Sequence, residues 1–467
     1  MSDNTFTLTQ ARYVQADGSL SVPSTIHVKD GKIEQILPAD HSAPAGPTYD
    51  CSQALVAPGF FNAHSHIPMT YFRGIGEGLP LQRWLVEKIF PLEAQLEPED
   101  IYWASKLGIA EMFATGTVSF SDMYMNMDQV AKACLETGIL ANLSVGMTSD
   151  QGKPVEDHRS YTQILQLWEI AAKTQGQVRC DLALHAEYTS DPTLAESLAS
   201  LALRLGKEGL EAENRDPVGF DTPIPTIQIH VSETAREHEE CKQRHGGKTP
   251  LEYLFSLGYD KVPLLLAHCV HLEDRDYDLL RQALANGAKI SLCHNPRSNL
   301  KLGSGIADLV RWLGVPKLNV CLGTDGASSN NSLDMQKEAS LMALLQKGFH
   351  EDASALSLPQ ILQIATTNGA RAQGRLDTGL IQEGMWADFV LWPTTLPFQF
   401  PYVDDLSNLF YADPGRPELV FIRGQGVYDH RSGQAEYPTL DLEEVLAECK
   451  GRFQGLMDRA TQARLGD

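Results

Sequence analysis

The strongest constraint on the fold is an alternation of short apolar runs with longer segments of helical period between residues 55 and 330. Eight runs are rich in Val, Ile, Leu or Phe, and almost all of them end in polar side chains. These runs are LVAPGFFNAH, TVSFSDMY, ILANLSVGMTSD, VRCDLALHAEY, TIQIHVSET, PLLLAHCVH, AKISLCHN and LNVCLGTDG. A run that is apolar throughout is typical of a parallel strand buried on both faces. The intervening segments, such as PEDIYWASKLGIAEMFATG, space apolar residues as helices do and have a Gly close behind.

Eight strand–helix alternations predict an α/β protein whose main architecture is a distorted (β/α)8 TIM barrel. An open doubly wound sheet is the main alternative, but it should carry a Gly-rich phosphate turn after its first strand. This chain has His64 and His66 there instead. Residues 202–226 contain a charge cluster with Pro and Gly, and we expect an extended or irregular connection before the fifth strand.

The two flanks of the barrel have a different periodicity. Residues 1–57 and 383–435 alternate with period two, and STIHVKDGKIEQILPA has the pattern of a strand, an Asp-Gly turn and a second strand. The two flanks are predicted to comprise residues 1–57 and 376–435. Neither flank is long enough to bury a core alone, so we expect the two to form one small composite β-sandwich domain. The barrel then spans 58–375, and 436–467 is predicted to be an amphipathic helix.

Charge and composition restrict the partners and the compartment. The formal charge is 38 − 60 = −22, which disfavours nucleic acid and anionic membranes as partners. No window approaches eighteen uninterrupted apolar residues, and the N-terminal MSDNTFTLTQ lacks the features of a signal peptide. The eight cysteines are scattered without a CxxC pair, which favours free thiols in a reducing cytoplasm.

The first strand ends in two histidines that point to the same side. Residues i and i+2 of a strand share a face, so His64 and His66 present two imidazoles to one point. Enzymes with this barrel place their active sites at the carboxyl ends of the strands. Two histidines in this position are either metal ligands or hydrogen-bonding residues at a loop mouth.

Three other strand ends carry similar side chains. The fifth run ends with His230 and then Glu233, the sixth with His268, and the eighth with Asp325. Each of these residues alone could be structural or functional. Their convergence at one rim predicts a metal site, and imidazole with carboxylate and no Cys suits zinc or another borderline divalent metal.

The motifs PGFFNAHSH, HVSET, LLLAHCVHL, CHNPRSNLKLGSG and GTDGASSNNSLDM resemble those of the amidohydrolase superfamily. Within it, the chain is similar nearly end to end to the 5′-methylthioadenosine/S-adenosylhomocysteine deaminases. The resemblance implies four ligands for a single divalent metal: His64, His66, His230 and Asp325. The expected metal is Zn²⁺, with Fe²⁺ or Mn²⁺ as alternatives. A carbamylated lysine is not implied, because His185 ends the fourth strand where two-metal members carry Lys.

The resemblance also assigns catalytic roles. Glu233 is expected to shuttle protons, His268 to orient or polarise the attacking water, and Asp325 to accept the water's other proton. Thr234 and Glu237 have the spacing of a capping box that would start the next helix behind Glu233. His294 and Asn299, at the end of the seventh strand, are expected to support the site.

Substrate contacts are predicted from weaker matches. The family places a glutamate 27 residues beyond the second histidine of HxH to bind ribose hydroxyls, which is Glu93 here. His185 matches a histidine expected to contact the purine or sugar, and Trp84 is expected to form an apolar wall. A solvated helix-start carboxylate and a buried aromatic are the alternatives for Glu93 and Trp84. Some members hold the amino-acid carboxylate of S-adenosylhomocysteine with arginines after the third strand. Only Arg159 lies in that region here, which favours methylthioadenosine or adenosine.

The predicted function is hydrolytic deamination of an adenosine-type nucleoside, a small molecule, by a cytoplasmic enzyme that family resemblance suggests is a homo-oligomer. A guanine or oxidised-purine deaminase, or a triazine amino- or chlorohydrolase, is the alternative on the same scaffold. Guanine deaminases usually carry an Arg-Phe pair where this chain has HAEYTS, and triazine chlorohydrolases often lose the acid at position 233. A metal-free scaffold or binding protein is a remote alternative, since all four ligands are retained.

Overall fold

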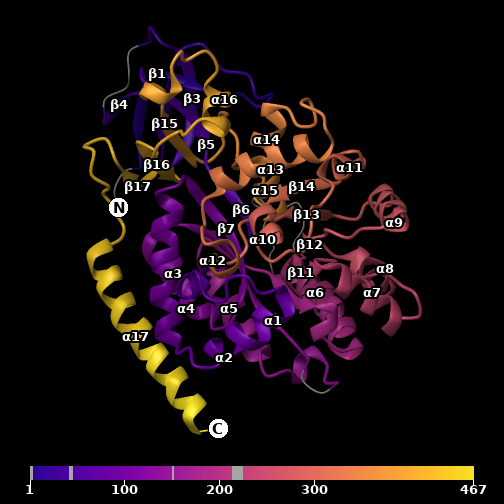
Figure 1. Ribbon diagram of the computed structural model, residues 1–467. Coiled ribbons are helices and arrows are strands. Elements are labelled where there is room, and N and C mark those ends of the chain that lie inside the picture. The colour runs from indigo at the N-terminus through magenta and orange to yellow at the C-terminus, as the bar shows by residue number, and fades with distance from the viewer. Residues whose placement is uncertain (1–3, 42–45, 150–151, 213–223, 467) are drawn as a thin grey trace.

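The computed structural model describes residues 4–41, 46–149, 152–212 and 224–466 (Figure 1). Its strands are β1 Phe6–Tyr13, β2 Ser24–Lys29, β3 Lys32–Pro38, β4 Thr48–Asp50, β5 Ala54–Pro58, β6 Phe60–Ser65, β7 Thr117–Tyr124, β8 Leu140–Met147, β9 Val178–Cys180, β10 Leu182–Ala186, β11 Ile227–Val231, β12 Leu264–His268, β13 Ile290–His294, β14 Asn319–Leu322, β15 Phe389–Pro393, β16 Leu419–Ile422 and β17 Gln425–Asp429.

The α-helices are α1 Leu81–Trp84, α2 Phe90–Glu93, α3 Pro98–Phe113, α4 Met127–Thr137, α5 Tyr161–Ala172, α6 Pro192–Ala212, α7 Ala235–Arg244, α8 Pro250–Ser256, α9 Asp274–Ala285, α10 Pro296–Lys301, α11 Leu309–Leu313, α12 Ala327–Asn330, α13 Met335–Phe349, α14 Leu358–Ala365, α15 Thr367–Ala372, α16 Asp405–Tyr411 and α17 Leu442–Gly466. A 3-10 helix, η1 Ile67–Phe72, follows β6, and a π-helical turn, η2 Leu85–Ile89, joins α1 to α2.

Eight parallel strands form a nearly closed barrel in the order β14-β13-β12-β11-β10-β8-β7-β6, with β9 paired to β8. The predicted TIM-barrel fold is therefore confirmed. At the seam between β14 and β6, the Asp325 N–H donates to the His64 carbonyl at 3.0 Å. A Cβ on Gly323 would lie 2.8 Å from the backbone N and O of His64, so only glycine lets the two chain segments approach this closely. The seam brings two predicted metal ligands together.

The first apolar run is two strands rather than one. It breaks at Gly59, where β5 ends in one sheet and β6 begins in the barrel. The Gly59 N–H donates to the Asp388 carbonyl at 3.0 Å, and a Cβ at this position would lie 2.3 Å from Val118 Cγ1. The Pro-Gly pair at 58–59 thus passes the chain from one sheet to the other.

Both ends of the chain build the second sheet, in the order β17-β16-β15-β5-β1-β2-β3, with β4 paired to β1 (Figure 1). Its core includes Phe6, which stacks on Phe421 with ring centroids 4.6 Å apart and packs edge-on against Phe389. A unit composed of both flanks is therefore confirmed, because strands from residues 6 and 421 share one core. The domain boundaries at 57, 375 and 435 stay predictions.

The expectation of an irregular connection across 202–226 is wrong for its first part. Helix α6 continues to Ala212, because Leu198, Leu201 and Leu205 place apolar side chains on one buried face. The charged and glycine residues that follow Leu205 hide this spacing in the sequence. Residues 213–223 lie outside the described part of the chain.

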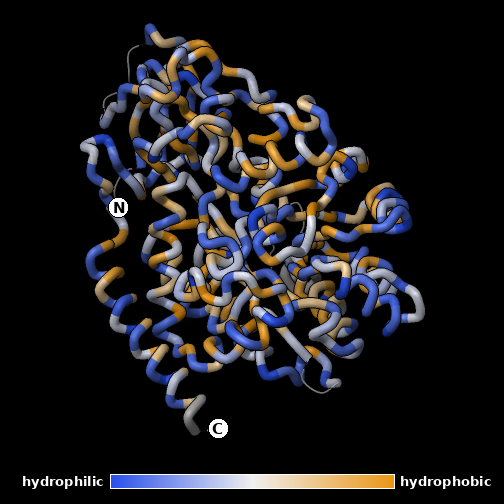
Figure 2. Tube along the Cα trace, viewed as in Figure 1, coloured by the Kyte–Doolittle hydropathy of each residue, from blue (hydrophilic) through white to orange (hydrophobic). Residues whose placement is uncertain are grey.

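The C-terminal helix α17 runs beside α3 (Figure 1). Hydrophilic and hydrophobic residues mix along its tube (Figure 2), and the buried residues Val445, Cys449 and Leu456 recur at helical spacing. Arg459 Nη2 and Arg452 both form ion pairs with the buried carboxylate of Asp100 at the start of α3. Among the described residues, we find no helix with the length and hydropathy that a bilayer crossing requires.

Candidate metal centre and pocket

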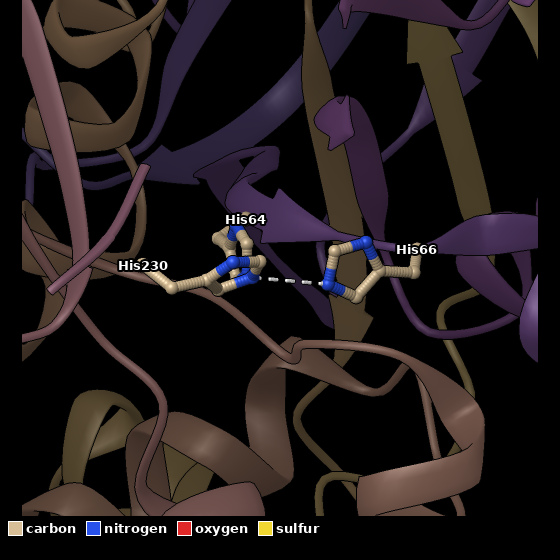
Figure 3. Close-up of side chains that lie close together, drawn as sticks. All are labelled: His64, His66 and His230. Atoms are coloured by element: carbon tan, nitrogen blue, oxygen red, sulfur yellow. Dashed lines mark hydrogen bonds between the residues drawn. The ribbon is translucent and has the colours of Figure 1, made fainter. Parts of the chain in front are cut away.

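Three histidines meet at the carboxyl ends of β6 and β11 (Figure 3). One nitrogen each of His64, His66 and His230 lies within 4.8 Å of the others. The Nε2 atoms of His66 and His230 are 3.3 Å apart. Asp325 Oδ1 lies 3.2 Å from His66 Nε2 and 3.7 Å from His64 Nε2. All four predicted ligands therefore converge on one point.

The other ring nitrogen of two histidines is held by backbone carbonyls. His66 Nδ1 donates to the Met123 carbonyl at 2.6 Å, and His230 Nδ1 donates to the His185 carbonyl at 2.6 Å. These bonds turn Nε2 of each ring towards the cluster, which is how metal-binding histidines are usually oriented. The buried Nε2 of His64 has no hydrogen-bond partner among the described residues. This nitrogen lies 3.7 Å from Asp325 Oδ1, and a buried imidazole nitrogen beside a carboxylate is a suitable pair of ligands for a cation.

Asp325 is held in an unusual backbone conformation by a dense set of donors. Its φ of 60° lies in the left-handed region. Oδ2 accepts from Ser298 Oγ at 2.6 Å and Ser329 Oγ at 3.0 Å, and Oδ1 accepts from the Gly326 N–H at 2.7 Å. Burial acts to raise the pKa of Asp325, but its hydrogen bond with His66 and the nearby histidines lower the pKa well below its usual range. The carboxylate is therefore ionised.

The pKa values of the three histidines shift in opposite directions. Burial lowers the pKa of His64 and of His230 well below the usual value, so both rings are neutral, as metal ligands must be. Burial also acts to lower the pKa of His66, but the hydrogen bond with Asp325 outweighs it and raises the pKa to about 9. A divalent cation bound here would balance the negative charge of the Asp325 carboxylate, as a protonated His66 does without it.

Glu233 and His268 lie beside the four ligands, and both are buried. His268 Nε2 is 3.8 Å from Glu233 Oε2, and His268 Nδ1 bonds Asn299 Oδ1 at 2.8 Å. Ser304 Oγ donates to Glu233 Oε1 at 3.3 Å. His294, in contrast, packs against Trp312, and no described residue hydrogen-bonds its ring nitrogens. The structure thus brings Asn299 into contact with these groups but gives His294 no such contact.

The predicted capping box is present where the chain leaves β11. Thr234 accepts from the Glu237 N–H, and the Glu237 carboxylate accepts in return from the Thr234 N–H. The same carboxylate accepts from the N–H groups of Ser232 and Glu233, each at 2.8 Å. Ser232 has a φ of 49°, so the bend that presents Glu233 is held mainly by Glu237.

The cluster opens into a cavity of about 950 Å³. Trp84, Glu93 and His185 all line it, as predicted. Tyr124 at the end of β7 also lines it, and its hydroxyl donates to Glu93 Oε1 at 2.6 Å. The sequence did not single out Tyr124 as a pocket residue, although it is the last residue of the second apolar run.

Arg159 also lines the cavity, together with Ser160 and Gln163. Its alignment could not be fixed from the sequence, because no periodic element surrounds it. Its place in the structure gives the mouth of the pocket a cationic side chain.

A second group of metal-type side chains lies outside this cavity. One atom each of Glu187, Cys241 and His245 lies within 4.8 Å of the others. Arg244 donates from Nε and Nη2 to the two oxygens of Glu187, and His245 Nε2 lies 2.6 Å from Oε1. Because the carboxylate already has both oxygens paired, this group is an ion-pair network.

The sequence model of the amidohydrolase family matches residues 55–427 of this chain. The 5-methylthioadenosine/S-adenosylhomocysteine deaminase of Dictyoglomus thermophilum is 36% identical over 412 residues, covering 88% of this chain and 89% of the relative. The same-named protein of Moorella thermoacetica is 36% identical over 446 residues, covering 94% and 97%. Both support the resemblance predicted from the motifs.

Solved structures agree with the fold. An adenosine deaminase from Xanthomonas campestris with bound zinc is 28% identical, with a TM-score of 0.84 over 98% of each chain. A zinc complex of atrazine chlorohydrolase from Arthrobacter aurescens has a TM-score of 0.82 over 96% of this chain and 100% of that one. At 19% identity this second likeness supports the fold alone. From the family match and the relatives together, the chain belongs to the amidohydrolase family.

Proposed function

We propose that this protein catalyses the metal-dependent hydrolytic deamination of an adenosine-type nucleoside, giving the inosine analogue and ammonia. 5′-Methylthioadenosine is the favoured substrate. The observation that carries the proposal is the convergence of three imidazoles and Asp325 beside Glu233, at the inner end of a 950 Å³ cavity. The curated relatives named for this activity give independent support.

His64, His66, His230 and Asp325 would hold one divalent metal. Three imidazoles and one carboxylate suit Zn²⁺, with Fe²⁺ or Mn²⁺ as alternatives. The unpartnered Nε2 of buried His64 fits this assignment. Bound there, a divalent cation lowers the pKa of a water from about 15.7 towards 7.

Glu233 is the proposed proton shuttle. Its carboxylate takes a proton from the attacking water, delivers it to the ring nitrogen beside the reacting carbon, and later passes a proton to the departing ammonia. His268, held by Asn299, orients the water for attack at C6. Asp325, kept ionised by its surroundings, accepts the second proton of the water, and this is the proton that reaches the departing amine through Glu233. Because both Glu233 and His268 are buried, water outside the site does not compete for these bonds.

The cavity wall supplies the proposed substrate contacts. Glu93 accepts hydrogen bonds from the ribose diol, His185 contacts the purine or sugar, and Trp84 forms an apolar side. The ammonia released from 5′-methylthioadenosine, adenosine, guanine and an aminated triazine, each offered to zinc-loaded protein, tests the substrate class. Release from guanine or the triazine alone would contradict the proposal.

Replacing Glu233 with Gln tests the mechanism. The variant should keep its zinc, because its side chain is not among the proposed ligands, and lose turnover by about 10³-fold or more. Near-normal turnover with zinc retained would remove Glu233 from the proton path. The matched variant Glu240→Gln, in the exposed Arg236–Glu240 pair of α7, should turn over normally.

S-Adenosylhomocysteine is a second candidate substrate, because Arg159 lines the same cavity. A guanidinium at the mouth could pair with the amino-acid carboxylate that methylthioadenosine lacks. Arg159→Gln should then raise KM for S-adenosylhomocysteine about 10-fold and leave KM for methylthioadenosine unchanged. An equal effect on both substrates would exclude this role.

A further inference from the structure

The carboxylate of Glu93 sits at the end of a helical segment. It is the last residue of α2, a single helical turn that follows the π-helical turn η2. The elements α1, η2 and α2 follow one another without a break from Leu81 to Glu93, but a helical backbone leaves a Glu side chain several rotamers. A contact to the side chain itself is therefore needed to fix the direction of the carboxylate.

Tyr124 supplies that restraint from the barrel. Its hydroxyl donates to Glu93 Oε1 at 2.6 Å, a length typical of a hydrogen bond to an ionised acceptor. The ring is buried at the end of β7, a strand whose residues are all buried. Among the described residues, no donor reaches Glu93 Oε2, so the second oxygen is the one available to a ligand.

The tip of β7 also orients the metal centre. The carbonyl of Met123, one residue before Tyr124, accepts from His66 Nδ1 at 2.6 Å. The Tyr124 ring lies 6.3 Å from the His66 ring, centroid to centroid. Two consecutive residues of one rigid strand therefore hold a proposed metal ligand and the proposed sugar carboxylate.

We infer that Tyr124 is a positioning residue that fixes Glu93 Oε2 at a set distance from the metal centre, and so makes the pocket selective for nucleosides with an intact 2′,3′-diol. This inference rests on the proposed function. A diol presents two donors at a fixed spacing, and a carboxylate held by one oxygen can meet them in one orientation only. Without the hydroxyl, Glu93 loses the bond that gives its carboxylate a direction.

The test measures binding rather than turnover. Adenosine and 2′,3′-dideoxyadenosine are titrated by calorimetry into zinc-loaded Glu233→Gln protein, with and without Tyr124→Phe. Phenylalanine keeps the buried ring and removes only the hydroxyl. The preference for adenosine, expressed as the ratio of the two Kd values, should fall about 10-fold, the usual size for a hydrogen bond to a charged group. Zinc content and the Kd of the dideoxy compound should not change.

The chain offers a matched control and a second variant. Tyr102 donates to Glu136 Oε2 at the same distance of 2.6 Å, outside the residues that line the cavity, so Tyr102→Phe should leave the ratio unchanged. Glu93→Gln should lower the ratio by itself, and adding Tyr124→Phe should lower it no further, because the two side chains act as a unit.

The outcomes separate this inference from the proposed function. A ratio unchanged by Tyr124→Phe, with adenosine still bound, overturns the positioning role alone. A full additional loss in the double variant also overturns it. Protein that binds neither nucleoside overturns both the inference and the proposed substrate class.

Discussion

Removing the Glu237 carboxylate should disable the enzyme without removing its metal. This side chain accepts from the N–H groups of Ser232 and Glu233 at 2.8 Å, and from the Thr234 N–H at 3.4 Å. In Glu237→Ala the N–H groups of Ser232 and Glu233, both in buried residues, lose their acceptor. Each buried, unpaired N–H costs about 1–3 kcal/mol, so the free energy of unfolding should fall by about 2–6 kcal/mol.

The loss of activity follows from geometry. Ser232 has a φ of 49°, and the bend that presents Glu233 would relax once its acceptor is gone. A displacement of about 1 Å of a catalytic group costs on the order of 10²-fold in rate, so kcat should fall by about that factor. His230 lies on β11 and keeps its bond to the His185 carbonyl, so zinc content should stay at the wild-type level.

The assay compares kcat, zinc content and thermal unfolding of Glu237→Ala with those of Glu252→Ala. Glu252 closes the same type of capping box with Thr249 at the start of α8, away from the cavity. Its loss should lower stability by about 1 kcal/mol and leave kcat unchanged. Wild-type kcat in Glu237→Ala, or loss of zinc from it, would refute the reasoning.

Two further predictions concern the barrel. Gly323→Ala would place a Cβ 2.8 Å from His64 N and O at the β6–β14 seam, so zinc content should fall and stability should drop by about 1–3 kcal/mol. The control Gly348→Ala lies in α13, where the added Cβ meets no atom of another segment within 4 Å, and it should keep its zinc and lose no stability. Full zinc occupancy in Gly323→Ala would contradict this prediction. Burial raises the pKa of Asp181 from 3.8 to about 6, against the bonds from Asn142 and Gln228. The folded state therefore holds this proton more tightly than the unfolded state, and wild-type stability relative to Asp181→Asn should decrease as pH rises from about 4 to 6 and stay lower above it. A difference in unfolding free energy that is constant across this range would contradict the prediction.

The barrel and its metal-type residues were predictable because both depend on local pattern. Each strand is an apolar run followed by polar residues, and the carboxyl ends of parallel strands meet at one rim of the barrel. His230 and Asp325 could therefore be placed together, although 95 residues separate their positions in the sequence. The ligand distances confirm only the convergence, and the assigned roles stay predictions.

What could not be predicted depends on contacts between distant segments. The break at Gly59 is hidden inside a continuous apolar run, because only the pairing partners reveal that β5 and β6 lie in different sheets. Tyr124 looks like an ordinary core aromatic until α2 places Glu93 against its hydroxyl. Arg159 lies in a loop without periodicity, so its distance to the cavity depends on the path of the chain.

The sheet built from both ends also imposes an order on synthesis. Strand β5 pairs with β15 through Pro58 and Phe389, which are 389 − 58 = 331 residues apart. At about 5–20 residues per second, the ribosome needs roughly 15–65 s to deliver that partner. All eight barrel strands, down to Leu322, are made within this interval, while one edge of β5, whose residues are all apolar, stays unpaired. Exposed apolar edges invite pairing with other chains, so the vulnerable period of this protein runs from the synthesis of β5 to the arrival of residues 389–393.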